Sequence, residues 1–343
     1  MARDRPLSAT YEAPPNIALV KYWGVRDADR VLPYNSSLSV TLAGMRSRTT
    51  VLFDPDRATD AVELNGAPAA DGPRRGVVEF LDRVRAMAGL SIAAVVRSDN
   101  NFPTASGLAS SASGFAALAG AASAAAGLAL SDRALSRLAR FGSGSAARSI
   151  FGGFVEWRAG ARADGADCYA RPLYPAGHWP ALVDEVALIA DAPEKEVRSK
   201  VAMQSTVRTS PGYAARVAAV PRRLARMRRA IGARDAATLF PLVMEECDSF
   251  RDVCETSRPS LDYLTPASRA VLAEVRAINR DAGRPVAAYT HDAGAHVHVF
   301  TLRRHAPLVR RRLRRLPGVR SVLEVRPGPG AHRVDRPGRP RRR

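Results

Sequence analysis

Apolar residues recur along the chain with two spacings, one typical of strands and the other of helices. Alternation or short continuous apolar runs predict strands at residues 17–20, 37–42, 49–53, 61–64, 92–97, 154–158, 186–190, 286–290, 297–302 and 321–325. Spacings of three and four predict helices at residues 76–88, 115–126, 132–139, 235–254, 266–282 and 307–316. Because strands and helices come in runs and do not strictly alternate, the pattern favours an α+β protein of two halves, the second beginning at residue 186.

Turn residues and prolines mark where these elements end. Asn65 and Gly66 form a strong hairpin-turn signal. The stretch 204–231 is helical in character, but Pro211 and Pro221 predict that it breaks into two or three pieces, because proline removes a helical hydrogen bond.

One loop combines features that suit a polyphosphate. Residues 101–114 read NFPTASGLASSASG and lie between the strand at 92–97 and the Ala-rich helix at 115–126. Small residues let the backbone approach an anion closely, hydroxyls supply donors, and a helix N-terminus adds free N–H groups and a positive dipole end. The alternative is a serine-capped helix that simply follows a turn.

Length and composition indicate a globular protein with a substantial core. The 343 residues suffice for one large domain or two smaller ones, and 46% hydrophobic with 25% charged residues is ordinary. No apolar run reaches the roughly 18 residues needed to span a membrane. The first residues lack an apolar signal core. We therefore expect a cytoplasmic protein with no membrane partner.

The formal net charge of +19 is concentrated at the C-terminal end. Residues 303–343 hold fifteen arginines against Glu324 and Asp335, a net +13, which leaves +6 for the other 302 residues. Such a patch attracts phosphates, but no aromatic residue after Phe300 offers a base-stacking platform. Some of these arginines lie on the predicted helix at 307–316 and others end a Pro/Gly-rich tail, which we interpret as solvated, and we do not expect a nucleic-acid partner.

Several common catalytic motifs are absent from the sequence. It has no Gly-Lys-Ser/Thr of a P-loop, no Gly-x-Ser-x-Gly elbow and no His-Glu-x-x-His zinc pattern. His296 and His298 alternate on a predicted strand and so share a face, with His291 nearby. Without a matched carboxylate, they are typical of polar strand residues rather than of a metal site.

Three charged residues remain as candidates beside the Ser/Gly loop. Lys21 directly follows the first strand, Arg148 lies in a tight turn of small residues, and Asp292 lies in a turn between two strands. Alone, the lysine reads as solvated and the aspartate as a turn former beside Gly294. Together, an acid–base carboxylate among anion-binding cations suits phosphoryl transfer to a hydroxyl.

Five motifs give the chain a resemblance to a known family. They are APPNIALVKYWG at 13–24, LPYNSSLS at 32–39, the loop at 101–114, GSGSAARS at 142–149 with FGGF at 151–154, and YTHDAG at 289–294. In this order they resemble diphosphomevalonate decarboxylases of the GHMP kinase superfamily, over residues 11 to 302.

The resemblance implies a two-lobed GHMP kinase-like α+β fold. A ribosomal S5 domain 2-like lobe is expected over residues 1–185, and a ferredoxin-like α/β sandwich lobe with the catalytic aspartate over 186–325. The Arg/Pro-rich residues 326–343 have no place in the resemblance, and we expect them to form a disordered tail. Members of the family are commonly homodimers.

The resemblance also implies a reaction, in which mevalonate 5-diphosphate and ATP give isopentenyl diphosphate, ADP, phosphate and carbon dioxide. A tertiary hydroxyl leaves poorly, whereas its phosphate ester leaves well. Departure of that phosphate creates positive character that draws electrons from the adjacent carboxylate. By similarity, Asp292 orients or deprotonates the hydroxyl, Arg148 holds the substrate carboxylate, and Lys21 with Tyr22 meets substrate phosphate or the catalytic centre.

Further contacts are implied for the substrates. Ser143 and Ser145 resemble diphosphate or carboxylate contacts, and Ser210 resembles another substrate-side position. Mg²⁺ is expected through the ATP phosphates, with Ser110 as the candidate protein contact and no other protein ligand. The residues expected to cradle those phosphates are Ser106, Gly107, Leu108, Ala109, Ser110 and Ser111.

Two departures from the family pattern leave alternatives open. The family usually carries lysine after Tyr-Trp-Gly, where this chain has Val25, with Arg26 as an imperfect substitute. Where the family reads Asp-Ala-Gly-Pro-Asn, this chain has Ala295 and His296 in the last two positions. A decarboxylase of mevalonate 5-phosphate, a mevalonate 3-kinase, and an inactive homologue acting as a basic binding protein are therefore the alternatives.

Overall fold

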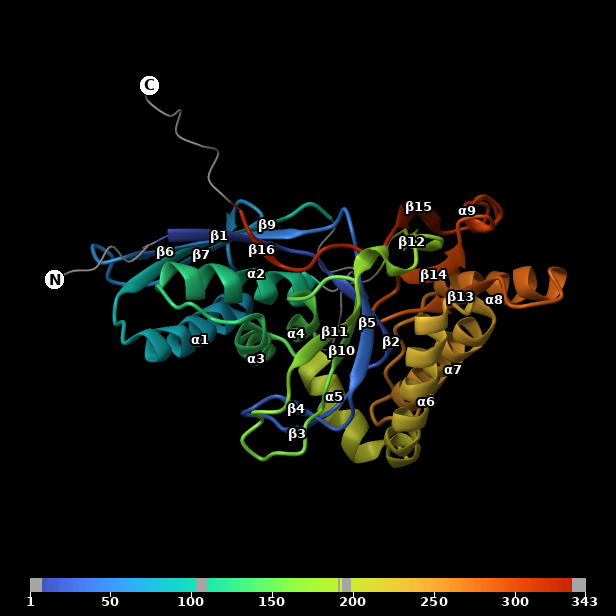
Figure 1. Cartoon of the computed structure of the whole chain (residues 1–343), viewed down its shortest axis with the longest axis horizontal. Coiled ribbons are helices and arrows are strands. Elements are labelled where there is room, and N and C mark those ends of the chain that lie inside the picture. The colour runs from blue at the N-terminus through green and yellow to red at the C-terminus, as the bar shows by residue number, and fades with distance from the viewer. Residues whose placement is uncertain (1–7, 103–109, 191, 193–198, 335–343) are drawn as a thin grey trace, which may run out of the picture.

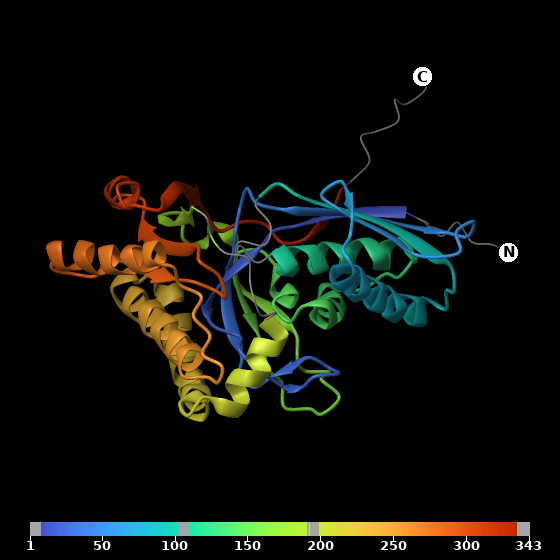
Figure 2. The ribbon, with the colours of Figure 1, turned by 180° about the vertical axis from the view of Figure 1, so that it is seen from behind.

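The chain folds into two lobes joined along a broad seam (Figures 1 and 2). The structure, a computed structural model, describes residues 8–102, 110–190, 192 and 199–334. Within these residues, none of the helices combines the length and the apolar character needed to cross a bilayer. The predicted α+β class and two-lobed arrangement are confirmed.

The first lobe is built on a six-stranded sheet in the order β16-β1-β6-β9-β7-β8. Its strands pair antiparallel except for β7 and β9, which are parallel. Helices α1, α2 and α3 cover one face of this sheet (Figure 1). The bounds are β1 Ser8–Ala13, β6 Ser47–Asp54, β7 Ala61–Leu64, β8 Ala67–Pro68, β9 Ala93–Asn100, β16 His332–Arg333, α1 Asp71–Ala88, α2 Ser110–Ala125 and α3 Asp132–Gly142.

A second sheet, in the order β11-β10-β5-β2, lies at the seam. All residues of β2, β5 and β10 are buried, because apolar side chains from the second lobe cover the sheet. This burial explains why β2 reads as a nearly continuous apolar run, whereas β5 alternates apolar residues with the buried polar residues Ser37, Ser39 and Thr41. The bounds are β2 Asn16–Val20, β5 Ser37–Thr41, β10 Phe154–Trp157 and β11 Ala170–Tyr174, with the small ladder β3 Val25–Asp27 and β4 Leu32–Pro33 and the short helix α4 Ala146–Ser149 nearby.

The second lobe is an antiparallel sheet, in the order β13-β14-β12-β15, between helices. Side chains of α8 and α9 share a core with one face, and those of α6 and α7 fill the space between the other face and the seam sheet. The bounds are β12 Leu182–Ile189, β13 Ala287–Thr290, β14 Val297–Leu302, β15 Val319–Val325, α5 Ser199–Thr209, α6 Tyr213–Ala233, α7 Ala236–Glu255, α8 Pro266–Asp281 and α9 Ala306–Leu313, with a 3₁₀ turn at Ala176–His178.

Most predicted elements are present, with local differences. Ser131 caps α3 by accepting the Ala134 N–H, and Asn65 and Gly66 take positive φ angles in the β7–β8 turn. Pro221 lies inside α6 and does not break it, because it faces solvent while apolar neighbours hold the helix to the core. Strand β12 begins at Leu182, so the sheet of the second lobe starts before residue 186.

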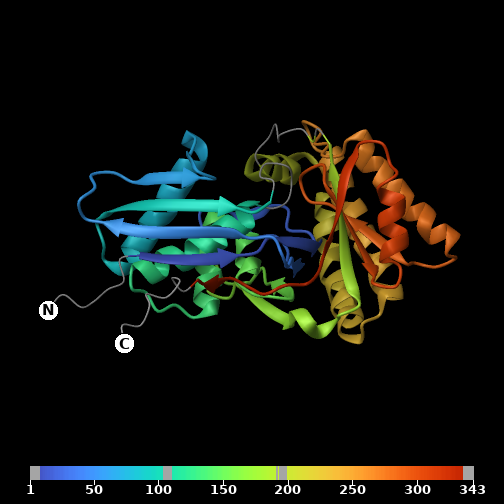
Figure 3. The same cartoon turned by 90° about the horizontal axis from the view of Figure 1, so that it is seen from above.

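The expectation of a disordered tail from residue 326 is wrong for residues 326–334. This segment leaves the second lobe and runs back along the first lobe (Figure 3). Its strand β16 pairs with the edge strand β1, and Gly328 exchanges backbone hydrogen bonds with Thr41 and Gly153 at 2.8 and 2.9 Å. A Cβ on Gly328 would lie 2.7 Å from the Ala43 backbone, so this close approach requires glycine. Residues 335–343 lie outside the described residues.

Candidate active site

The seam brings together two of the predicted residues from strands of different lobes. Lys21 follows the last residue of β2, and Asp292 lies two residues after the end of β13. The Lys21 Nζ donates to Asp292 Oδ1 at 2.7 Å, with the lysine side chain 2% and the aspartate side chain 26% exposed. The Thr290 hydroxyl donates to the Ala18 carbonyl at 3.4 Å and ties the two strands together.

The charges around Asp292 keep its carboxylate ionised. Burial raises the pKa of Asp292, but the charge and hydrogen bond of Lys21, with the charge of Arg148, outweigh burial and hold that pKa below its usual value. The side chain is therefore an anion near neutral pH. It can accept a hydrogen bond or a proton from a bound hydroxyl.

Arg148 lies on α4 with its guanidinium turned into the lobe. Its Nε donates to Asn16 Oδ1 at 3.0 Å and its Nη1 to the Ser37 hydroxyl at 2.7 Å. Burial lowers the pKa of Arg148 to about 10, with the charge of Asp292 acting in the opposite direction, so the side chain stays charged. Among the described residues no carboxylate forms an ion pair with Arg148, so its charge is available to an anionic ligand.

The glycine-rich turn before α4 presents hydroxyls beside an aromatic pair. The hydroxyls of Ser143 and Ser145 lie 3.1 Å apart, and the rings of Tyr22 and Trp157 meet edge to face with centroids 4.8 Å apart. A Cβ on Gly144 would lie 2.7 Å from the Tyr22 ring, so only glycine lets the turn come this close. Burial raises the pKa of Tyr22, against the charge of Arg148, so its hydroxyl stays a donor.

Ser210 is the remaining predicted substrate contact. Ser210 follows α5, is 8% exposed and shares a hydrogen bond of 2.9 Å with the Thr256 hydroxyl. In the part of the chain that the structure describes, Ser210 forms no hydrogen bond with Lys21, Arg148 or Asp292. Its place in the site stays a prediction.

The Ser/Gly loop is only partly within the described residues. Ser106, Gly107, Leu108 and Ala109 lie outside them, whereas Ser110 and Ser111 open α2. The helix begins on the side of the first lobe that faces the second (Figure 2). Its first N–H groups and positive dipole end suit an anion there.

The histidines near Asp292 are buried and held by other groups. His291 Nδ1 lies 2.8 Å from the Asp292 carbonyl, and burial, helped by the charge of Lys21, lowers its pKa to about 4. His296 Nδ1 accepts the Ile189 N–H at 3.1 Å, and burial also lowers its pKa to about 4, so it is a neutral acceptor there. His298 Nδ1 lies 2.6 Å from Asp184 Oδ2.

The substitute cation proposed from the sequence does not point to this centre. Val25 pairs with Pro33 in the small β3–β4 ladder. Arg26 is exposed and donates to the Gly160 carbonyl at 3.2 Å. The cation that the family pattern places after Tyr-Trp-Gly therefore has no replacement from Arg26 in this conformation.

Sequence reasoning missed a buried ion cluster directly behind Lys21. Glu246 of α7 forms ion pairs with Arg216 and Arg223 of α6, and one of its oxygens accepts the Lys21 N–H at 3.0 Å. The sequence did hold a signal. Arg216 occupies a position on the same helix face as Val220 and Leu224, where an apolar residue is expected.

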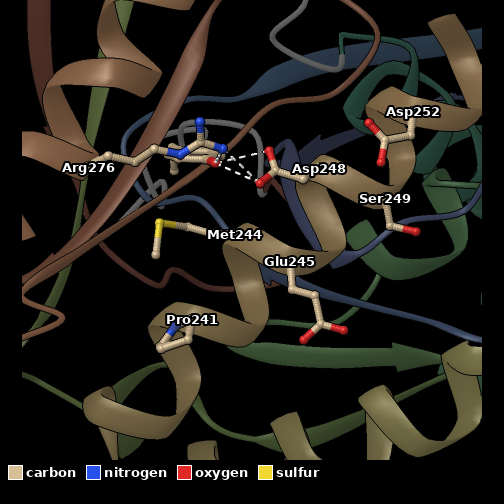
Figure 4. Close-up of a pocket in the computed structure, with 8 residues that line it drawn as sticks. Pro241, Met244, Glu245, Asp248, Ser249, Asp252 and Arg276 are labelled. Atoms are coloured by element: carbon tan, nitrogen blue, oxygen red, sulfur yellow. Dashed lines mark hydrogen bonds and ion pairs between the residues drawn. The ribbon is translucent and has the colours of Figure 1, made fainter.

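A separate groove of about 510 Å³ lies over the outer side of α7 (Figure 4). Its carboxylates Glu245, Asp248 and Asp252 make it unsuited to an anionic substrate. Asp248 accepts a hydrogen bond from the Tyr289 hydroxyl at 2.9 Å and pairs with Arg276 at 2.9 Å. These three side chains of the groove therefore already have partners in one another. We do not place the reaction there.

The two-lobed α+β fold, with a lysine–aspartate pair where the lobes meet, agrees with the GHMP kinase-like class that the sequence motifs indicate. Residues 13–170 match the diphosphomevalonate decarboxylase-like N-terminal domain, and residues 186–325 match the mevalonate 5-diphosphate decarboxylase C-terminal domain. The chain belongs to the diphosphomevalonate decarboxylase family.

Individual relatives are similar over most of their length. The diphosphomevalonate decarboxylase of Aspergillus fumigatus is 41% identical over 317 residues, covering 88% of this chain and 78% of that protein. A solved structure described as "MDDEF in complex with MVAPP, AMPPCP and Magnesium" has a TM-score of 0.89 at 38% identity, covering 96% of this chain and 99% of that one. The mevalonate diphosphate decarboxylase of Enterococcus faecalis has a TM-score of 0.88 at 36% identity, with the same coverage.

Proposed function

We propose that this chain catalyses the ATP-dependent decarboxylation of mevalonate 5-diphosphate to isopentenyl diphosphate. The observation that carries the proposal is the ionised Asp292, which lies 2.7 Å from Lys21 at the lobe seam and within the electrostatic influence of Arg148. The relatives named as diphosphomevalonate decarboxylases, and the complex that holds MVAPP, AMPPCP and magnesium, support the choice of substrates.

In the proposed mechanism, the oxygen of the substrate's 3-hydroxyl attacks the terminal phosphorus of ATP, and Asp292 accepts the proton of that hydroxyl. Lys21 keeps that carboxylate ionised and oriented. The C3–O bond of the resulting phosphate ester then breaks, and its electron pair leaves with the phosphate. The bond between C2 and the carboxylate supplies the electrons of the new double bond, and carbon dioxide leaves.

The neutral ligands of Arg148 support its role toward the substrate carboxylate. Asn16 and Ser37 fix the guanidinium without cancelling its charge. A cation held in this way can orient the carboxylate before it leaves as neutral carbon dioxide, after which the attraction is lost. Tyr22 and the two serines of the turn, Ser143 and Ser145, are proposed as further contacts to the substrate's anionic groups, and Ser210 as an outer one.

The residues present fit ATP with Mg²⁺. The described residues contain no group of three His, Cys, Asp or Glu side chains that could hold a metal ion. By the family resemblance, the metal is proposed to bind through the ATP phosphates, with Ser110 at the start of α2 as the protein contact and residues 106–111 as the phosphate-binding segment. When bound, Mg²⁺ supplies neutralisation of phosphate charge.

A panel of three substrates tests the proposal. Mevalonate, its 5-phosphate and its 5-diphosphate are each supplied with ATP and Mg²⁺, and ADP and carbon dioxide are both measured. The expected result is equal release of ADP and carbon dioxide with the 5-diphosphate. ADP without carbon dioxide indicates a 3-kinase, and turnover of the 5-phosphate alone indicates the other decarboxylase. Salt-sensitive RNA or DNA binding without ATP turnover would indicate a basic binding protein.

A homodimer is proposed from the family resemblance alone, and a cytoplasmic location from the apolar pattern of the sequence. Light scattering on the purified protein measures its mass directly. A particle of 36.8 kDa, the mass of one chain, would contradict the homodimer.

A further inference from the structure

The main chain of Lys21 is held by side chains instead of by a strand. Strand β2 ends at Val20, so the lysine lies just beyond the ladder. Its N–H donates to Glu246 Oε1 at 3.0 Å, and its carbonyl accepts Asn35 Nδ2 at 3.0 Å. Arg216 Nη2 lies 3.4 Å from the same carbonyl. Glu246 and Arg216 come from the second lobe, so the position of the lysine depends on a contact across the seam.

Glu246 is oriented by a charge on each oxygen. Its side chain is 0% exposed, Arg216 contacts the oxygen that also accepts the Lys21 N–H, and Arg223 contacts the other oxygen. A buried ion cluster of this kind contributes little net stability, because desolvation of the charges offsets their attraction. Its clearest effect is geometric, since the two arginines leave the carboxylate one orientation.

The side chain of Lys21 contacts Asp292, the residue proposed to accept the substrate's proton. The Lys21 ammonium donates to Asp292 Oδ1, while its peptide nitrogen is bound by Glu246. A shift of the peptide is therefore passed to the ammonium, and from it to the carboxylate that faces the substrate. Placement errors of about 1 Å at a reacting centre cost on the order of 100-fold in rate.

We propose that Glu246 is a positioning residue for the reaction, which acts by accepting the Lys21 N–H across the lobe seam. The inference rests on the proposed function, because the kinetic assay below uses mevalonate 5-diphosphate and ATP as substrates. It assigns Glu246 no contact with substrate, and it identifies Arg216 and Arg223 as the groups that orient it.

Two near-isosteric variants separate this role from a structural one. Glu246→Gln keeps an oxygen that can accept the Lys21 N–H, whereas Glu246→Leu has no acceptor, and both lose the same charge. We expect the Leu variant to lose about 100-fold in kcat, with KM for mevalonate 5-diphosphate and ATP within about threefold of wild type. The Gln variant should keep most of the wild-type kcat. Glu245→Gln is the matched control, because Glu245 is 55% exposed and pairs with the same Arg223 but does not touch Lys21.

A second arm guards against misfolding. If the single variants unfold because two arginines are left with an unpaired charge, each is combined with Arg223→Met, which removes one positive charge from both. The proposal is overturned if the Gln and Leu variants lose kcat equally, or if kcat falls only in proportion to the unfolded fraction measured by thermal denaturation.

A third readout is independent of turnover. The sequence has three lysines, so ¹⁵N-lysine labelling gives three side-chain signals, and Lys21→Arg assigns the one of interest. We expect the Gln variant to keep the wild-type Lys21 shift and the Leu variant to change it. An unchanged shift in the Leu variant would contradict the proposal. If wild type releases ADP without carbon dioxide, the decarboxylase assignment fails, whereas the Gln–Leu comparison of ADP release still tests Glu246.

Discussion

Replacement of Asp292 by asparagine tests the centre of the proposed mechanism. The amide has nearly the shape of the carboxylate and still offers an oxygen to the Lys21 ammonium, so the local geometry is retained. It cannot accept a proton. Loss of a positioned general base typically costs 10² to 10⁴ in rate, about 3 to 5 kcal/mol in the barrier, and we expect kcat to fall within this range.

The same change weakens the fold by a smaller amount. A unit charge pair with the observed Nζ–Oδ1 distance of 2.7 Å attracts by on the order of 6 kcal/mol at an effective dielectric constant of about 20. Desolvation offsets most of this attraction, and the Asp292 side chain is 26% exposed, so we expect a net loss of about 1 to 3 kcal/mol in the free energy of unfolding. Such a loss leaves the variant folded at 25 °C in a domain of ordinary stability.

The pH dependence of that loss has a definite sign. The folded-state pKa of Asp292 lies below its unfolded value of about 3.9, because Lys21 and Arg148 outweigh burial. The ion pair thus stabilises the fold above the unfolded pKa and ceases to do so as the pH falls through the folded pKa. The stability difference between wild type and Asp292→Asn should be constant near neutral pH and shrink below about pH 4.

The assay measures ADP and carbon dioxide release in parallel with calorimetric binding of an ATP analogue. We expect nucleotide affinity to stay within about threefold, because Ser110 and Ser111, the described part of the predicted phosphate contacts, open α2 in the other lobe. Asp60→Asn is the matched control, since Asp60 also forms a largely buried ion pair, in its case with Arg85, and its side chain is 9% exposed. It should lower stability and leave kcat unchanged. Retention of more than about a tenth of wild-type kcat by Asp292→Asn would refute the role of Asp292.

Three further predictions follow from the site and the C-terminal segment. Arg148→Lys should raise KM for mevalonate 5-diphosphate by about 10- to 100-fold, because one ammonium cannot replace both guanidinium bonds, and an unchanged KM would exclude the carboxylate contact. Gly144→Ala should lower activity as its Cβ displaces the Tyr22 ring, which steady-state kinetics would detect; full activity would contradict that packing. Deletion of residues 326–343 should lower the melting temperature because it exposes the β1 edge, whereas deletion of 335–343 should not; equal melting curves would refute this.

Most helices and strands could be predicted from the local spacing of apolar residues in the sequence. Apolar spacing predicts helix α1 and the strands of the second lobe, because each of these elements buries one face or both faces in a core. The residues Lys21, Arg148 and Asp292 became candidates only as a set, because alone the lysine reads as solvated and the aspartate as a turn former. The family motifs then suggested their roles.

Contacts between distant residues were decided only by the tertiary structure. Residues 326–334 are rich in glycine, proline and arginine and read as a tail, yet their backbone pairs with a strand edge that the sequence does not identify. Pro221 reads as a break, but the core on the opposite side of α6 holds the helix through it.

The geometry of the centre is the clearest case. Sequence indicated that Lys21 and Asp292 carry chemistry, but their ion pair joins residues 271 positions apart and exists only because two lobes meet. The same meeting buries Glu246 against the Lys21 peptide, in a helix where a glutamate reads as an ordinary surface residue. Periodicity reports which side of an element is buried, whereas the partner that it meets there depends on how the lobes pack.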